Sequence, residues 1–346
     1  MATSPLSGYE SYESKTFIYK TVDSIELKLD VLYPTSRSQS SPLNVLIHIH
    51  GGFLVVGDRY SFVPHWLISA CVSRNWIFVT PDYRLLPETT AHSCVDDCLS
   101  AYSWVLETLP KELDVQIRDI MLAGSSAGGY LALTTTTQLP KPQRQRLKAL
   151  LLIYGVLDAT NERYTTDKSN IFNRGPINTA PTLKQLAEEK ENGTARVLPG
   201  YDVPANATAE SDYRLGLMST FHQEHLYPDW MTGIDGLSRE IKEKGPNAIP
   251  EQHRRLFATA FGLPKDMPPT ALVHGRNDSA VPVVLSEIAV AELKKAGVEV
   301  RVELPEDAEH GFDARAGKIS VEKDGLEEPW AKALRSCVEF LAEKVG

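Results

Sequence analysis

Gly124-Ser125-Ser126-Ala127-Gly128 is the stretch of sequence that decides the fold. It follows the apolar run Ile120–Ala123 and opens a stretch with helix-like spacing, Ala127–Thr137. A Gly-x-Ser-x-Gly pattern between a strand and a helix is typical of a sharp turn that presents a serine hydroxyl above a sheet. Only Ser126 has glycine at both second neighbours, so Ser126 is the candidate nucleophile. An ordinary strand–turn–helix rich in small residues is the alternative.

Apolar runs without alternation recur along the chain. They are Val45–His50, Trp76–Thr80, Ala149–Tyr154, Thr270–His274 and Val298–Leu304. Such runs indicate strands buried on both faces, as in a parallel sheet. Lys15–Val22 and Ile25–Tyr33 are rich in β-branched and aromatic residues with partial alternation, which predicts an antiparallel edge pair before a polar loop at Ser36–Pro42.

Helix-like spacing separates these runs. It is found at Pro64–Ser73, His92–Thr108, Ala127–Thr137, Val284–Ala296 and Pro329–Val345. Strands that alternate with helices predict an α/β fold with a mostly parallel sheet flanked by helices. In such sheets the chemistry gathers at the carboxyl ends of the strands.

The segment 158–268 breaks this rhythm. It is polar and loop-rich, has no clear buried-strand run, and shows helical pieces near Thr182–Asn192 and Leu237–Lys244. A long excursion inside a compact domain is usually functional or disordered. We interpret 1–157 and 269–346 as the core and 158–268 as an inserted cap.

Composition narrows the possible partners. The 346 residues carry a net charge of −9 with no strong basic patch, which argues against nucleic-acid binding. The first residues do not have the pattern of a secretory leader, and no apolar run reaches the roughly 18 residues that a membrane helix needs. We therefore expect a cytoplasmic protein without membrane contact, its oligomeric state left open.

Metal and nucleotide sites find no support in the sequence. The four cysteines, which include Cys94 and Cys98 on one predicted helix face, are better explained as free buried thiols. His222 and His225 lack a third ligand, and the chain has neither H-E-x-x-H nor a glycine-rich nucleotide motif. We expect no metal and no cofactor.

A serine nucleophile needs a base and an acid that orients the base. His310 follows the last apolar run, and Asp278 follows the run Thr270–His274. Along the chain the nucleophile Ser126 is therefore followed by the acid Asp278 and then by the base His310, which is the order expected for a serine on a Gly-x-Ser-x-Gly turn. A surface-loop histidine is the alternative for His310. Asp158 is the rival acid, because it follows the preceding strand.

Backbone N–H groups near Ser126 are candidates for an oxyanion hole. The residue after the nucleophile, Ala127, is one. The turn Gly51-Gly52-Phe53 follows another strand and supplies further donors, since glycine lets the backbone approach a ligand closely.

Large aromatic residues in the cap are candidates for substrate contacts. They are Tyr213, Phe221 and Trp230, with Tyr227 beside them. These rings would hold a medium-sized apolar substrate. The alternative is that they form the hydrophobic core of the cap itself.

Taken together, the motifs resemble the hormone-sensitive-lipase-like branch of the α/β-hydrolases, a family rich in carboxylesterases. The resemblance is carried by His50–Asp58, Asp82–Glu88, Gly124–Gly129, Asp278 and Glu309–Phe312. It implies an eight-stranded sheet, a cap, ester hydrolysis without a cofactor, and an oxyanion hole from the amides of Gly52, Phe53 and Ala127.

Three differences from that family stand out. Phe53 replaces a third glycine, Ser125 replaces an aspartate beside the nucleophile, and Thr89–His92 replaces a proline-rich stretch. Ser125 is also a candidate for substrate contact. The block around Asp278 looks closer to dienelactone-hydrolase-type and peptidase-type relatives.

These features favour hydrolysis of a small-molecule ester or lactone through an acyl-enzyme on Ser126. A biosynthetic enzyme with the same three residues is the second hypothesis, acting by acyl transfer, lactone formation or thioester cleavage. A non-catalytic binding protein is the third, because a fold does not fix a function.

Overall fold

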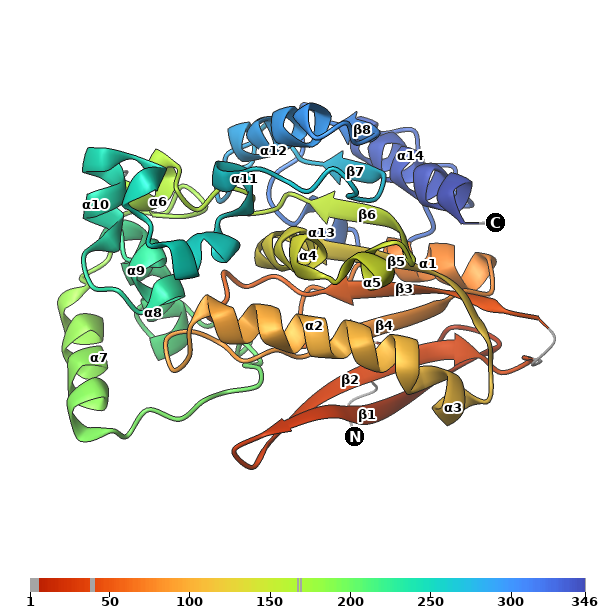
Figure 1. The fold of residues 1–346 in the computed structure, drawn as a ribbon, viewed down its shortest axis with the longest axis horizontal. Helices are drawn as coiled ribbons and strands as arrows, with labels where there is room; N and C mark the ends of the chain where they lie inside the picture. Colours follow the sequence, from red (N-terminus) through yellow and green to blue (C-terminus); the bar gives the residue numbers. More distant parts are fainter. Residues whose placement is uncertain (1–5, 38–40, 167, 169, 346) are drawn as a thin grey trace.

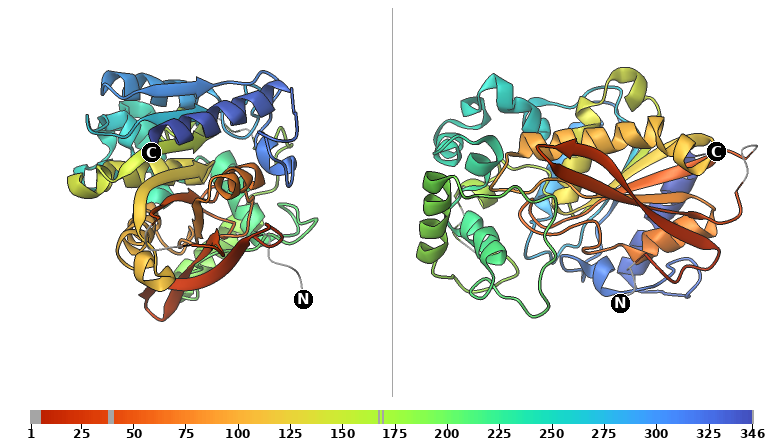
Figure 2. Two further views of the ribbon diagram at one scale, coloured as in Figure 1. Left: turned by 90° about the vertical axis from the view of Figure 1, so that its right-hand side faces the viewer. Right: turned by 90° about the horizontal axis from the view of Figure 1, so that it is seen from below.

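The computed structural model describes residues 6–37, 41–166, 168 and 170–345. Residues 1–5, which the expectation about a leader includes, and residues 38–40 of the predicted polar loop lie outside the described residues. One sheet runs through the molecule with helices on both faces (Figures 1 and 2). The predicted α/β class is confirmed.

Eight strands form this sheet in the order β1-β2-β4-β3-β5-β6-β7-β8. They are β1 (Tyr12–Val22), β2 (Ile25–Pro34), β3 (Leu43–Ile49), β4 (Ile77–Pro81), β5 (Ile117–Ser125), β6 (Leu147–Ile153), β7 (Thr270–Val273) and β8 (Val300–Glu303). β2 pairs antiparallel with β1 and with β4, and the other pairs are parallel. The predicted mostly parallel sheet and antiparallel edge pair are therefore confirmed.

One predicted strand differs in its surroundings. Val298–Leu304 reads as a strand buried on both faces, but β8 is only half-buried along its length. β8 is the last strand of the sheet and pairs with β7 alone, so one edge is left without a neighbouring strand.

Helices from two groups cover the two faces of the sheet. On one face lie α1 (His65–Ser73) and α14 (Pro329–Lys344); on the other lie α2 (Ala91–Glu107), α4 (Ala127–Gln138) and α12 (Val284–Lys295). Short helices α3 (Leu109–Leu113), α5 (Lys141–Arg144) and α13 (Phe312–Arg315) complete the layers. The four cysteines are free and buried in these layers, as predicted.

Helices and loops, but none of the eight strands, occupy the segment that we interpret as a cap. It holds α6 (Glu162–Thr165), α7 (Ala180–Asn192), α8 (Tyr213–Gln223), α9 (Tyr227–Thr232), α10 (Leu237–Lys244), the 3₁₀ turns η1 (Pro246–Ala248) and η2 (Glu251–Leu256), and α11 (Ala258–Phe261). Figure 1 shows this group beside the carboxyl ends of the parallel strands. The bounds 158–268 stay a prediction. No helix among the described residues is both long and apolar enough to pass through a bilayer.

Glycines hold β5 and α4 close together at the turn that contains Ser126. A Cβ atom on Gly124 would lie 2.0 Å from the carbonyl oxygen of Gly128, and a Cβ on Gly128 would lie 2.0 Å from the carbonyl oxygen of Ile49. Real Cβ atoms do not approach backbone oxygens so closely, because the atoms would overlap. Both positions therefore require glycine.

We predict that Gly128→Ala destabilises the fold by about 3 kcal/mol, at the upper end of the usual cost of overpacking, since the backbone of β3 must move. Gly175→Ala is the matched control, because nothing lies within 4 Å of a Cβ there. Urea unfolding of both variants measures the difference. Equal stability of the two variants would contradict the steric argument.

Candidate active site

Ser126 occupies the turn between β5 and α4, as its motif predicts. Its backbone has φ 57° and ψ −119°, a conformation that L residues rarely adopt. Its N–H donates to the carbonyl of Ile153 over 2.8 Å, which ties the turn to the end of β6. The residue is 4% exposed, so little water surrounds the hydroxyl.

His310 contacts this hydroxyl, and Asp278 contacts the other side of the His310 ring. The Nε2 atom of His310 is 3.0 Å from Oγ of Ser126, and its Nδ1 is 2.7 Å from Oδ2 of Asp278. Because a carboxylate can only accept, Nδ1 carries the proton and Nε2 accepts from the serine hydroxyl. The structure thus brings the three residues predicted from the sequence into one chain of hydrogen bonds.

The side chain of Asp278 is buried, yet four donors surround its carboxylate. Oδ1 accepts from the N–H groups of Ala280 and Val281 over 2.9 and 2.8 Å. Oδ2 contacts His310 and lies 3.2 Å from Nε2 of His274. Burial raises the pKa of Asp278, but the hydrogen bonds from His274 and His310 outweigh burial and hold the pKa well below its usual range.

His274 is a part of the site that the sequence analysis missed. It follows β7 directly, and its Nδ1 is 2.7 Å from Oγ of Ser286 while its Nε2 is 2.9 Å from the carbonyl of Val281. A serine hydroxyl that donates to Nδ1 leaves the proton on Nε2, which then points toward Asp278. The signal in the sequence is a histidine four residues before the acid, at the end of the apolar run Thr270–His274.

Asp158, the rival acid, makes a local turn instead. Its Oδ1 accepts from the N–H of Thr160 over 2.9 Å and from the hydroxyl of Thr160 over 2.6 Å. Side chains of this type commonly cap such turns. Geometry therefore favours Asp278 as the partner of His310.

The turn Gly51-Gly52-Phe53 closes against the nucleophile. A Cβ on Gly51 would lie 3.0 Å from the carbonyl oxygen of Ser125 and 3.1 Å from Cβ of Ser126, so the absence of a side chain eases the close approach of the turn to the serine. Gly52 has φ 108°, and a Cβ there would lie 1.9 Å from the carbonyl oxygen of Val56. Phe53 also has a left-handed φ, 53°, and its side chain is buried. Ala127 begins α4 next to this turn.

Ser125 contacts a histidine where the resembling family has an aspartate. Its Oγ is 2.9 Å from Nε2 of His48, and both residues are buried. Burial and the neighbouring His50 lower the pKa of His48 to about 3, so this ring is neutral at physiological pH. Next to the nucleophile, a hydrogen bond between two neutral side chains therefore takes the place of the charged aspartate found in that family.

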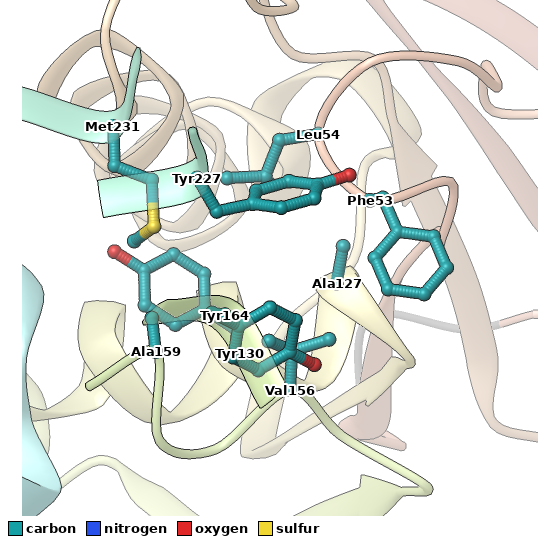
Figure 3. A pocket seen from close by; sticks show the side chains of 9 residues that line it. All are labelled: Phe53, Leu54, Ala127, Tyr130, Val156, Ala159, Tyr164, Tyr227 and Met231. Carbon is teal, nitrogen blue, oxygen red and sulfur yellow. The ribbon is translucent and has the colours of Figure 1, made fainter. Parts of the chain in front are cut away.

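A cavity of about 870 Å³ opens at Ser126, a size that accommodates a small molecule. It is bordered by Ser125, Ser126, His310, Gly51, Gly52 and Phe53 from the core, and by Phe172, Arg174, Val203, Ala207, Leu215 and Met218 from the cap segment, among others. The charged residues on its wall are Arg174 and Arg315. Figure 3 shows the residues that line a second, smaller cavity, and Phe53 is among the residues that line both cavities.

Tyr213, Phe221 and Trp230 line neither of these two cavities. Phe221 is fully buried and stacks on Trp230 with ring centroids 5.5 Å apart. Tyr213 donates to Glu189 over 2.9 Å. The placement favours the alternative interpretation, in which these aromatics form the core of the cap. Helix spacing alone does not tell which side of a small helical layer faces a ligand.

Two family models match the chain. The first, described as alpha/beta hydrolase fold, matches residues 46–209, and the second, described as prolyl oligopeptidase family, matches residues 221–328. The second match contains Asp278 and His310, in agreement with the peptidase-type resemblance of that block. Among the described residues, no group of three or more histidine, cysteine or carboxylate side chains is arranged to hold a metal ion.

Curated relatives share about a quarter of their residues with this chain. Lipase 2 of Moraxella sp. is 27% identical over 80% of the chain and 56% of the relative. A probable carboxylesterase M8 of Phoma sp. is 26% identical over 89% and 92%. A non-reducing polyketide synthase of Penicillium brasilianum is 25% identical over 96% of this chain and 14% of the synthase. The chain thus spans about half of the lipase and a small part of the synthase.

Solved structures share the fold. Esterase B of Lactobacillus rhamnosus superposes with a TM-score of 0.60 at 17% identity, over 97% of this chain and 85% of that chain. At this level of identity the likeness concerns the fold alone.

We predict that Asp278→Asn lowers kcat by about 10³–10⁴-fold, because the amide N–H group can donate to Nδ1 and favour the wrong tautomer of His310, and because a neutral amide does not stabilise a charged imidazole. Asp158→Asn is the matched control and should keep near-normal turnover. Steady-state kinetics with a p-nitrophenyl ester compares the two variants. A larger loss in Asp158→Asn would reverse the assignment of the acid.

Stability should depend on the ionisation of Asp278. Since the folded-state pKa lies below the unfolded value of about 3.9, the ionised carboxylate stabilises the folded state above roughly pH 4. This contribution is lost as the pH falls through the folded-state pKa. Urea unfolding should therefore show a stability gap between wild type and Asp278→Asn near pH 7 that narrows below pH 4. A gap that does not change with pH would contradict the account.

Proposed function

Because this chain belongs to the α/β-hydrolases of the hormone-sensitive-lipase-like type, we propose that it hydrolyses a carboxylic ester of a small molecule through an acyl-enzyme on Ser126. The observation that carries the proposal is the hydrogen-bonded line from Ser126 through His310 to Asp278, with distances of 3.0 and 2.7 Å. These distances fit a nucleophile, its base and the group that orients the base.

Acylation begins at the serine hydroxyl. Oγ of Ser126 attacks the acyl carbon while Nε2 of His310 takes the hydroxyl proton, and the carbonyl becomes an oxyanion. When the tetrahedral intermediate collapses, the bond to the leaving oxygen breaks and His310 donates its proton to the alcohol. The acid Asp278 stabilises the transient imidazolium and stays ionised throughout.

Deacylation repeats these steps with water. His310 removes a proton from water, the hydroxide oxygen attacks the acyl carbon, and the proton then returns to Oγ of Ser126 as the carboxylic acid leaves. The net reaction consumes one water and gives one acid and one alcohol.

The developing oxyanion needs preorganised donors. We assign this role to the backbone N–H group of Ala127 at the start of α4, and to those of Gly52 and Phe53 in the turn that begins at Gly51. The close approach of Gly51 to Ser126 supports the assignment, because the turn that follows β3 borders the nucleophile. Such donors typically contribute a hundred- to a thousand-fold in rate.

A second candidate uses the same acyl-enzyme with a different partner. The match to a polyketide synthase over 96% of this chain favours a thioester as the acyl donor or a hydroxyl as the acyl acceptor. The match to the probable carboxylesterase, which spans nearly the whole of both chains, favours water and an ester. We give the hydrolase first place on that ground.

We predict that a fluorophosphonate probe labels the protein at Ser126, because the probe requires a serine activated by a base. Ser126→Ala should lose the label, and Ser125→Ala should keep it. Peptide mass spectrometry locates the adduct, and p-nitrophenyl acetate and butyrate test turnover. A folded wild-type protein that takes no label would refute both enzymatic candidates. Labelling with negligible turnover of every simple ester would favour the second one.

A further inference from the structure

Asp313 is a buried carboxylate near the active site that has no part in the proposed hydrolysis. It lies in α13, three residues after His310, and is 1% exposed. Among the described residues two groups donate to it: Nε1 of Trp66 reaches Oδ2 over 2.8 Å, and the hydroxyl of Tyr154 reaches Oδ1. A buried carboxylate is costly unless hydrogen bonds satisfy it, so these two contacts hold the three side chains together.

Tyr154 links this carboxylate to the base. It follows β6 directly, is buried, and lines the large cavity at Ser126. The centroid of its ring lies 4.6 Å from that of His310. The rings of Phe172 and Phe53 lie farther from His310, at 5.8 and 6.3 Å. Of these three rings, that of Tyr154 therefore packs most closely against the base.

The hydroxyl of Tyr154 is the donor in its bond to Asp313. Burial and the charge of Asp313 raise the pKa of Tyr154 well above its ordinary value, although a hydrogen bond with Ser125 opposes this shift. The phenol therefore stays protonated, and a carboxylate can only accept. The contact with Ser125, the residue before the nucleophile, ties the same hydroxyl to the turn that carries Ser126.

The backbone alone does not determine where the Tyr154 ring lies. Its φ is 38°, a left-handed value that a residue other than glycine adopts at a cost. Its N–H donates to the carbonyl of Val273 over 2.7 Å, which anchors the main chain but does not fix the torsion angles of the side chain. The bond to Asp313 fixes the far end of that side chain. Since Asp313 follows His310 so closely, the same bond holds the loop of the base against the end of β6.

We propose that Asp313 is a positioning residue for the base. Through the hydroxyl of Tyr154 it holds the Tyr154 ring against His310, and this packing keeps Nε2 of His310 directed at Ser126. The inference rests on the proposed function, because that function gives His310 the role of base. Two buried carboxylates then orient one imidazole: Asp278 does so through a hydrogen bond to the ring, and Asp313 through a packed side chain.

Tyr154→Phe and Asp313→Ala test this pair, since the first removes only the hydroxyl and the second removes the carboxylate. Either change should lower kcat for p-nitrophenyl butyrate by about 10- to 100-fold, because a small misplacement of a catalytic group is costly. KM should stay nearly unchanged, because acylation and deacylation both use His310 and slow together. The rate of fluorophosphonate labelling at Ser126 should fall with kcat.

A double variant and a matched control sharpen the test. If the carboxylate acts through the hydroxyl, Tyr154→Phe combined with Asp313→Ala should lower kcat no further than the larger single change. Tyr102→Phe is the control: Tyr102 is buried in α2, its hydroxyl donates to the carbonyl of Gln143 over 2.9 Å, and it lines neither cavity. Its kcat and its labelling rate should equal those of wild type.

Thermal melting verifies that each variant folds, and if Asp313→Ala does not fold, Tyr154→Phe decides alone. Wild-type kcat and labelling rate in the folded variants, whatever their stability, overturn the inference and leave the proposed hydrolase standing. So does a raised KM with unchanged kcat, which would place Tyr154 in substrate binding, and so do losses that add in the double variant. A wild type that takes no label overturns the proposed function, and the inference falls with it.

Discussion

At Ser126 the chain leaves β5 and enters α4 with φ 57°, a backbone conformation that costs about 1–3 kcal/mol for a residue other than glycine. Packing holds it there. A Cβ on Gly124 would overlap the backbone of Gly128, and a Cβ on Gly128 would overlap the backbone of Ile49 at the end of β3, so only glycine allows this packing. The strained turn therefore depends on three elements at once, and it lifts the serine hydroxyl to the carboxyl edge of the sheet, where His310 meets it.

The charged carboxylate of Asp278 lies at the same carboxyl edge of the sheet. The loop after β7 wraps the carboxylate of Asp278 with the N–H groups of Ala280 and Val281 and with two imidazoles. These donors keep a buried carboxylate ionised, so that it can hold one tautomer of His310. His274 acts on His310 only through Asp278, which makes it a positioning residue. The core thus fixes the reacting groups, and the cap segment shapes the two cavities around them.

Sequence patterns were sufficient for the core because each buried strand is an apolar run that ends in a glycine or a polar residue. The edge strand β8 was the exception, since an apolar run does not reveal whether a strand has one neighbour or two. Motif order likewise gave Ser126, Asp278 and His310. The cap was less predictable: α8 and α9 pack around Phe221 and Trp230, and only the tertiary contacts show that these rings face one another.

The central claim is that the acyl group passes through Oγ of Ser126. Rapid-quench mass spectrometry during turnover of a p-nitrophenyl ester tests it most directly, because an acyl-enzyme adds a defined mass to one peptide. We expect the adduct on the peptide that contains Ser126, formed and consumed at rates that match steady-state turnover. Turnover with the adduct on another residue, or turnover that persists in Ser126→Ala, would contradict the account.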